Sequence, residues 1–307
     1  MDTGSGKKPR RIIPCGQPRK LLEELVALLN LEKIEENIFR GKSQDLGFGN
    51  IFGGQVLGQA LSAAVQTVTP DRPVHSLHAY FLLPGDPARP IVYNVDCIRD
   101  GKSFTTRRVV AVQKGRAIFN MSASFQVEEG GFEHQDELPD VPGPEGIRSE
   151  VEMARAVQDR IPETLRAKLV CERPIEIRPI DPVNPFSPKK KAPVRYAWFR
   201  ANGTLPDDRN VHLCLLAYAS DFGLVSTSLL PHRHTFWERS MQVASLDHAM
   251  WFHRPFRMDD WLLHAMRSPR ASNARGVNFG RVFTRVGVLV ASTAQEGLIR
   301  YRQPGQS

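Results

Sequence analysis

Cysteines and long hydrophobic runs are both scarce in this chain of 307 residues. It has four cysteines, Cys15, Cys97, Cys171 and Cys214, with no CxxC pair and no histidine at metal-ligand spacing. We therefore expect reduced thiols and no metal site. No apolar run approaches the roughly 18 residues that cross a bilayer, and the N-terminus lacks a signal-peptide hydrophobic segment. These absences predict an intracellular protein that does not insert into membranes.

The excess of positive charge is concentrated at one end of the chain. Residues 1–20 hold six Lys or Arg and one Asp, so they supply five of the eight excess positive charges. This tail is also rich in Gly and Pro, and we expect it to be disordered. The remaining excess of three is weak evidence for a nucleic-acid surface, so we predict no nucleic-acid partner. The chain is 41% hydrophobic and 24% charged, which is typical of a soluble globular protein.

The first half predicts helices followed by an antiparallel sheet. Leucines at helical spacing predict a packing helix over 20–36, and FGGQVLGQALSAAVQTV at 52–68 predicts a helix buried on most sides. Four strand-like runs follow at 74–82, 91–99, 103–113 and 117–127, with turn glycines at 101 and 115. A buried helix followed by four long antiparallel strands is the order of a hotdog module, a sheet wrapped around a central helix.

The middle of the chain has a different character. Residues 128–146 are acidic and rich in Pro and Gly, which predicts a connection. The helical pattern over 149–170 opens with Ser149 and Glu152 at capping-box spacing, and Pro162 is expected to divide it. A second polar stretch, NPFSPKKKAPVR, completes the predicted linker.

Two pairs of markers suggest an internal duplication. Ser76 and Gln126 are 50 residues apart, and so are Ser245 and Gln295, with similar sequence and turn glycines between them. Both halves are therefore predicted to share one fold. In the second half, Asp221 of LAYASDFGLVSTSLL is expected at the N-terminus of the second buried helix, either as a helix cap or as a functional carboxylate.

Several long motifs resemble one family. They are LNLEKIEENIFRG, FGGQVLGQAL, HSLHAYFLLPGD, LAYASD, LDHAMWFHRPF and GVLVASTAQEGLIR. Together they resemble the acyl-CoA thioesterase II family, the TesB type, over about residues 20–302. The resemblance implies an α+β double hotdog fold, with two antiparallel sheets each wrapped around a central helix in one chain. It also implies hydrolysis of fatty acyl-CoA to free acid and CoA without a cofactor, by a homo-oligomer, either a dimer or a tetramer.

The resemblance also implies a catalytic trio of Asp221, Ser245 and Gln295. Many relatives have Thr where this chain has Ser245, but the hydroxyl is retained. Thioester hydrolysis needs a positioned water, a base for its proton and donors for the oxyanion. A nucleophilic triad of Ser245, Asp247 and His248 is the alternative suggested by adjacency. We reject it because triads are assembled from distant positions and neighbouring strand side chains point to opposite faces.

Weaker predictions concern substrate contacts and chain organisation. The first half has Gly54 and Gln55 where an acid would be needed, so we expect it to supply pocket walls. Substrate contacts are predicted at Gly54, Gln55, His75, Arg107 and Arg275. The predicted organisation is a basic tail at 1–20, an N-terminal hotdog at 21–127, a linker with a helix at 128–194 and a C-terminal hotdog at 195–303.

Two other functions fit the same fold. An acyl-CoA hydratase would need an Asp/His pair for water addition, and we find no convincing hydratase motif. A non-catalytic acyl-CoA-binding protein would use the same apolar pocket, but the intact trio argues against it. Peroxisomal relatives end in a Ser-Lys-Leu type signal, whereas this chain ends RQPGQS, so a cytoplasmic location is expected.

Overall fold

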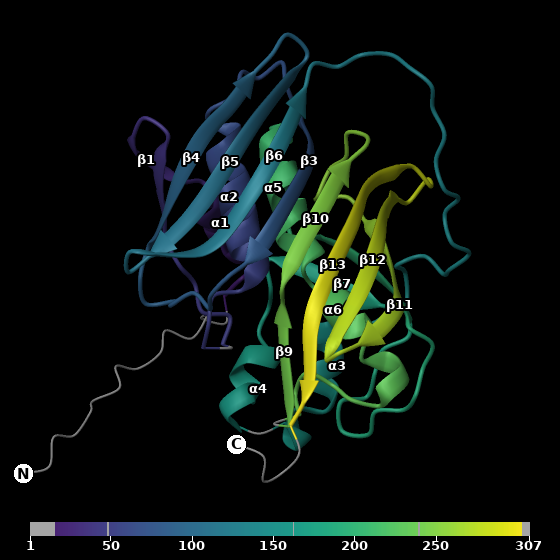
Figure 1. Ribbon diagram of the computed structural model, residues 1–307. Helices are drawn as coiled ribbons and strands as arrows, with labels where there is room; N and C mark the ends of the chain where they lie inside the picture. Colours follow the sequence, from purple (N-terminus) through teal and green to yellow (C-terminus); the bar gives the residue numbers. More distant parts are fainter. Residues whose placement is uncertain (1–15, 48, 162, 239, 303–307) are drawn as a thin grey trace, which may run out of the picture.

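A computed structural model describes residues 16–302, apart from 48, 162 and 239. Most of the predicted basic tail, residues 1–20, lies outside this part of the chain. The N-terminal half consists of helices α1 and α2 and a sheet that curves around α2 (Figure 1). Its elements are α1 (Pro18–Leu29), β1 (Glu32–Glu35), β2 (Ile38–Gly41), α2 (Gly53–Val65), β3 (Val74–Phe81), β4 (Ile91–Asp100), β5 (Phe104–Gln113) and β6 (Arg116–Gln126).

The C-terminal half repeats this order. It follows a long connection that carries α3 (Glu150–Ala156), a short 3-10 turn (Gln158–Arg160) and α4 (Glu163–Leu169). Its strands and helices are β7 (Ile175–Pro179), β8 (Val194–Ala201), α5 (Arg209–Ser220), α6 (Leu224–Thr227), a second 3-10 turn (Leu230–His232), β9 (Met241–Ser245), β10 (Asp247–Phe252), β11 (Leu262–Ser272), β12 (Arg275–Thr284) and β13 (Leu289–Tyr301).

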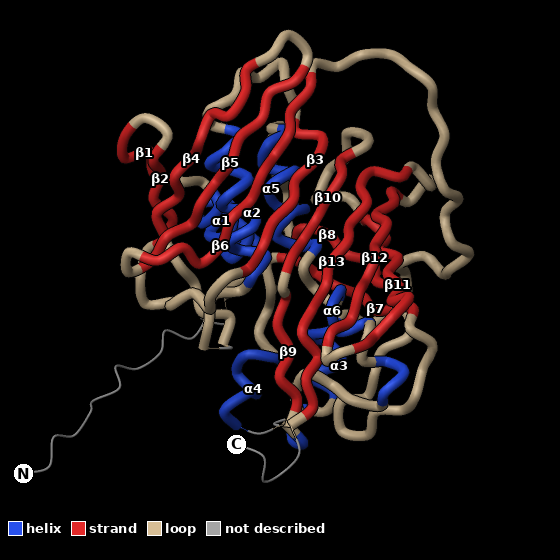
Figure 2. The backbone as a smooth tube through the Cα atoms, in the orientation of Figure 1, coloured by secondary structure: helices blue, strands red, loops and turns tan. Residues whose placement is uncertain are grey.

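All the strands belong to one continuous sheet. Its order is β1-β2-β4-β5-β6-β3-β10-β13-β12-β11-β8-β7, with β9 paired to β13. The first six strands and the last six mirror each other, and the halves meet where β3 pairs with β10 in antiparallel register. Figure 2 shows α1, α2, α5 and α6 on one face of this sheet. The two halves of this sheet, each with its own central helix, make the double hotdog that the sequence predicts.

The markers used to detect the duplication do not occupy equivalent registers. Ser76 lies opposite Ser124 of β6, whereas Ser245 lies opposite Gly297 of β13. Gln126 therefore follows the residue opposite Ser76, whereas Gln295 precedes the residue opposite Ser245. The halves share a topology, but the equal 50-residue spacing does not pair equivalent residues.

The two central helices pack directly on each other. A Cβ on Gly54 would lie 2.2 Å from the backbone oxygen of Tyr218, and a Cβ on Gly58 would lie 2.9 Å from that of Cys214. Glycine therefore permits an approach that any larger residue would obstruct. The contacts run in opposite directions along the two helices, so α2 begins where α5 ends. Phe52 stacks on Phe222 at this end, with ring centroids 4.4 Å apart.

Several local predictions are confirmed and some are wrong. The four strands of the first half agree with the predicted runs to within two residues, and Lys114 and Gly115 have positive φ in the β5–β6 turn. The capping box of Ser149 is present. The first helix ends at Leu29 rather than Glu36, because a hairpin follows whose turn residue, Asn37, has a φ of 60°.

The predictions that all thiols are reduced and that no stretch could cross a membrane also need correction. Cys171 is disulfide-bonded, so the expectation of reduced thiols is wrong for it, whereas Cys97 and Cys214 are free. The stretch Arg209–His232 has enough length and hydropathy to cross a membrane. However, 78% of its most apolar window is buried inside the protein, which is the behaviour of a core helix.

We predict that Gly58→Ala destabilises the fold. Alanine improves helix propensity by about 1 kcal/mol, but overpacking against the Cys214 carbonyl costs about 1–3 kcal/mol. The net result should be a loss of up to about 2 kcal/mol in the free energy of unfolding, measured by urea denaturation. Gly130→Ala is the control, since nothing lies within 4 Å of a Cβ built there. A Gly58→Ala protein more stable than wild type would contradict the proposed packing constraint.

Candidate active site

Asp221 is the C-cap of α5, with helical φ and ψ. The prediction that it stands at a helix N-terminus is therefore wrong. The sequence contained the correct signal, because Gly223 follows with a φ of 78°, the left-handed conformation that commonly ends a helix. The position matters for electrostatics, since the C-terminus of a helix disfavours a negative charge and other groups must hold the carboxylate.

The structure brings Asp221, Ser245 and Gln295 together. The Ser245 hydroxyl donates to Asp221 Oδ1 at 3.0 Å, and Gln295 Nε2 donates to the same oxygen at 2.6 Å. Ser245 is the last residue of β9, just before the strand is interrupted ahead of β10. Gln295 lies on the inward face of β13. Asp221 and Ser245 are partly buried, whereas Gln295 is buried.

A third donor to Asp221 comes from the other half of the chain. The Gly54 backbone N–H donates to Asp221 Oδ2 at 3.0 Å, across 167 residues of sequence. Gly54 lies in the first turn of α2, so the positive end of that helix faces the carboxylate. The predicted Gly54 contact thus lies at the site, as a donor to Asp221. A Cβ on Gly53 would lie only 2.7 Å from Asp221 Oδ2.

A buried polar layer lies behind the trio. His248 of β10 contacts Gln295 Nε2 through Nδ1 at 3.0 Å and Ser220 through Nε2 at 3.0 Å. Complete burial lowers the pKa of His248 to about 4, although the Asp221 carboxylate opposes this. Burial, together with the neighbouring His248, lowers the pKa of His264 to about 3. Ser220 and this layer were not predicted from the sequence, although alternation along β10 indicates that His248 points inward.

The structure separates the residues of the adjacent Ser245, Asp247 and His248 triad. Asp247 Oδ1 accepts the Glu296 backbone N–H at 2.7 Å, and burial raises the pKa of this carboxyl. Both ring nitrogens of His248 are engaged by Gln295 and Ser220 rather than by Ser245. Neither the base nor its orienting acid is therefore in contact with the Ser245 hydroxyl.

A cavity of about 1930 Å³ opens onto Asp221 and Ser245. Its wall combines the start of α2, the end of α5, the loop before β9 and the connection that carries α3 and α4. Aromatic side chains, including Phe52, Phe81 and Phe222, line it. The basic residues in its wall were not singled out from the sequence, and they are Arg148, Arg160, Lys168, Arg173 and Arg195.

None of the predicted substrate contacts is among the residues that line this cavity; Gly54 donates to Asp221 of its wall, and the other four lie elsewhere. Gln55 ties the loop at Lys42 and Gln44 to α2, through hydrogen bonds of 3.1 Å in both directions. His75 contacts Ser124 at 2.8 Å, and burial lowers its pKa. Arg107 is buried and pairs with Asp100, and Arg275 pairs with Glu296. Protein groups thus engage all four, and their role in binding substrate stays a prediction.

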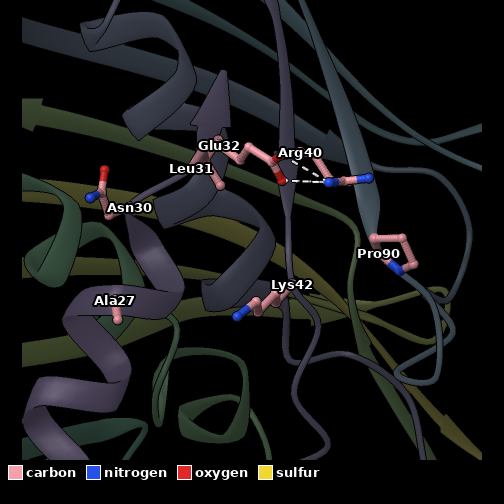
Figure 3. Close-up of a pocket in the computed structure, with 7 residues that line it drawn as sticks. All are labelled: Ala27, Asn30, Leu31, Glu32, Arg40, Lys42 and Pro90. Carbon is pink, nitrogen blue, oxygen red and sulfur yellow. Dashed lines mark hydrogen bonds and ion pairs between the residues drawn. The ribbon is translucent and has the colours of Figure 1, made fainter. Parts of the chain in front are cut away.

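A smaller hollow of about 580 Å³ lies between α1 and the β1–β2 hairpin (Figure 3). The Arg40 guanidinium at its edge is paired with the Glu32 carboxylate at 2.7 Å. Lys42 and Asn30 also face it. None of the trio lines this hollow, so the large cavity is the candidate active site.

Comparison with known proteins decides the family. A family model for acyl-CoA thioesterase matches residues 164–298, and one for the acyl-CoA thioesterase N-terminal domain matches residues 43–126. Acyl-CoA thioesterase 2 of Haemophilus influenzae is 48% identical, over 92% of this chain and 99% of that protein. The chain belongs to the acyl-CoA thioesterase II family.

Other relatives of this thioesterase agree. Human acyl-coenzyme A thioesterase 8 is 40% identical, over 94% of this chain and 92% of that protein. The crystal structure of the acyl-CoA thioesterase II TesB2 from Mycobacterium marinum is 42% identical, with a TM-score of 0.74 over 92% of this chain and 99% of that one. Sequence and fold therefore point to the same family along almost the whole chain.

The buried histidines predict a pH-dependent stability of the thioesterase. An unfolded histidine has a pKa of about 6.5, but His264 in the fold has a pKa of about 3. As the pH falls below about 6.5, the unfolded chain takes up a proton that the folded chain does not. Stability should therefore fall with pH, by up to about 1.4 kcal/mol per pH unit for this group.

Replacing His264 tests this assignment. The slope of unfolding free energy against pH, measured by urea denaturation between about pH 7 and pH 5, should be shallower in His264→Leu by close to one proton. His134→Leu, which alters an exposed histidine of the connection, is the control substitution. Equal slopes for His264→Leu and wild type would show that His264 has the same pKa in the folded and unfolded chain.

Proposed function

We propose that this acyl-CoA thioesterase cleaves fatty acyl-CoA with a water activated by the trio of Asp221, Ser245 and Gln295. The observation that carries the proposal is the convergence of three donors on one carboxylate at a cavity wall. Ser245 and Gln295 both donate to Oδ1, so they fix the carboxylate and leave a lone pair of Oδ2 available for a water. Such positioning is the main requirement for general-base catalysis.

In the proposed reaction, water attacks the thioester directly and no acyl-enzyme forms. Asp221 accepts a proton as the water oxygen bonds to the thioester carbonyl carbon. When the tetrahedral intermediate collapses, the C–S bond breaks and the proton passes to the CoA thiolate. Ser245 donates its own proton to Asp221, so its oxygen lone pairs can accept a hydrogen bond from the attacking water. The products are a free acid and CoA.

The oxyanion is expected at the N-terminus of α2. The helix start carries partial positive charge, and its first N–H groups have no partner within the helix. Gly53 and Gly54 place this backbone against Asp221, with no side chain between them. A carbonyl oxygen that becomes negative in the transition state would gain from these dipoles, as anions do at other helix starts.

The cavity fits a long substrate better than a small one. Its volume of about 1930 Å³ exceeds the roughly 300–1,000 Å³ of common small-molecule pockets. The aromatic walls suit an acyl chain, and the basic residues along the connection suit the phosphates of CoA. Cytoplasmic location and association into a dimer or tetramer stay predictions.

Hydratase chemistry fits this site poorly. It would need a histidine and an acid facing the substrate together, but His248 is completely buried with both ring nitrogens engaged. His234 and Glu238 do line the cavity as a pair, with Nδ1 2.7 Å from the carboxylate, but among the described residues no hydrogen bond joins this pair to Asp221, Ser245 or Gln295. Hydrolysis therefore remains the better account of the Asp221 environment.

Asp221→Asn should lower turnover roughly 10²-fold or more, because the amide cannot accept the proton of the water. The measurement is release of free thiol from acyl-CoAs of increasing chain length. Asp247→Asn is a matched control, since the amide oxygen can still accept the Glu296 N–H and turnover should stay near wild type. Unchanged turnover in Asp221→Asn, with the fold intact, would remove Asp221 from the mechanism.

Ser245 should be replaceable by threonine but not by alanine. Threonine keeps the hydroxyl and adds a methyl that restricts the rotamer, so kcat should stay within about threefold of wild type. Alanine removes the donor to Asp221 and should lower kcat roughly 10-fold or more. Steady-state thiol release measures both. A covalent acyl-serine detected by mass spectrometry in wild type would instead make Ser245 a nucleophile.

A further inference from the structure

A chain of hydrogen bonds leaves the last turn of α5 and returns to it. The Ser220 hydroxyl contacts the Ala217 carbonyl at 2.9 Å, and His248 Nε2 contacts Ser220 Oγ at 3.0 Å. His248 Nδ1 then contacts Gln295 Nε2, which reaches Asp221 Oδ1. Both ends of this chain, a backbone carbonyl and a carboxylate, are groups that accept hydrogen bonds and cannot donate them.

Those ends fix the direction of every bond between them. Ser220 has one hydroxyl proton, and it goes to the Ala217 carbonyl, so Ser220 Oγ must accept the proton of His248 Nε2. Neutral His248 therefore has a bare Nδ1, which needs a donor. From the other end, Asp221 also requires a donor from Gln295. The Gln295 amide meets both needs with the two protons of one nitrogen.

If the oxygen and nitrogen of the Gln295 amide exchanged places, two hydrogen bonds would become repulsive contacts. Its carbonyl oxygen would face the Asp221 carboxylate and the lone pair of His248 Nδ1 at the same time. In the observed orientation, Oε1 is buried and has no hydrogen-bond partner among the described residues. Because Oε1 gains no hydrogen bond this way round, the orientation depends on the two bonds made by Nε2.

We propose that His248, held in its Nε2–H tautomer by Ser220, is a positioning residue that makes the Gln295 amide donate to Asp221. It does not touch the substrate, since it is completely buried behind the trio. The inference rests on the proposed function, because it concerns how Gln295 is presented to the catalytic carboxylate. It assigns a purpose to two buried polar residues that the reaction itself does not use.

Two substitutions separate this role from simple packing. In His248→Asn, the side-chain oxygen can occupy the place of Nδ1 and accept from Gln295. In His248→Gln, the amide reaches the place of Nε2 and contacts Ser220, but no acceptor atom stands at the place of Nδ1. We expect kcat within about threefold of wild type for Asn and a loss of roughly 10-fold or more for Gln, with KM little changed in both.

The opposite ranking, or equal losses in the two variants, would overturn the inference, as would wild-type kcat in both. Asp221→Asn, assayed alongside, separates this failure from that of the proposed function. If Asp221→Asn loses turnover but His248→Gln does not, the trio stands and the positioning role fails. If Asp221→Asn retains turnover, the proposed function fails first.

A measurement on the unaltered protein keeps the inference testable if the variants do not fold. Nitrogen NMR of protein labelled with ¹⁵N-histidine reports which ring nitrogen carries the proton. At neutral pH, His248 should show a protonated Nε2 and a bare Nδ1. A protonated Nδ1 would leave Gln295 Nε2 without its acceptor and would overturn the proposal.

Discussion

The close antiparallel contact between α2 and α5 is the constraint on which the site depends. Gly54 and Gly58 let the two backbones approach to a distance that a Cβ would prevent. The approach places the positive end of α2 against Asp221, whose own helix presents its negative end there. The carboxylate is thus held by a donor from the first half and two donors from the second. Neither half contains the whole site.

This arrangement explains how a duplicated fold carries one assembled site. The first-half counterpart of Asp221 is Gln66, which caps the C-terminus of α2, so the prediction that Gly54 and Gln55 stand in the place of the acid is wrong. Gln66 is exposed, and its amide contacts Ser62. At the other end of the helix pair, α5 begins with Asp208 as its N-cap, so the first donors of that helix are already engaged by a carboxylate. The pseudo-symmetric position therefore lacks both the acid and the open helix start.

The sequence predicted the strands well because their side chains alternate, and it predicted the trio only through family resemblance. The helix end at Asp221 was misread because apolar residues flank it on both sides, although Gly223 carried the stop signal. The hydrogen bond from the Gly54 N–H to Asp221 could not be predicted, since it joins residues 167 positions apart through a helix packing that no local pattern encodes. The part of the cavity wall formed by the connection could not be predicted from the sequence for the same reason.

The polar layer beneath the trio is better understood as a source of geometry than of stability. Among the described residues, buried polar atoms without a partner include His264 Nε2, Asn278 Oδ1, Thr293 Oγ1 and Gln295 Oε1. Each such atom typically costs about 1–3 kcal/mol relative to solvent, and apolar residues of similar shape would avoid that cost. These residues lie on β11, β12 and β13, close behind the Asp221 carboxylate. A site that must hold one amide in one orientation needs polar neighbours, and the rest of the large apolar core compensates for their burial.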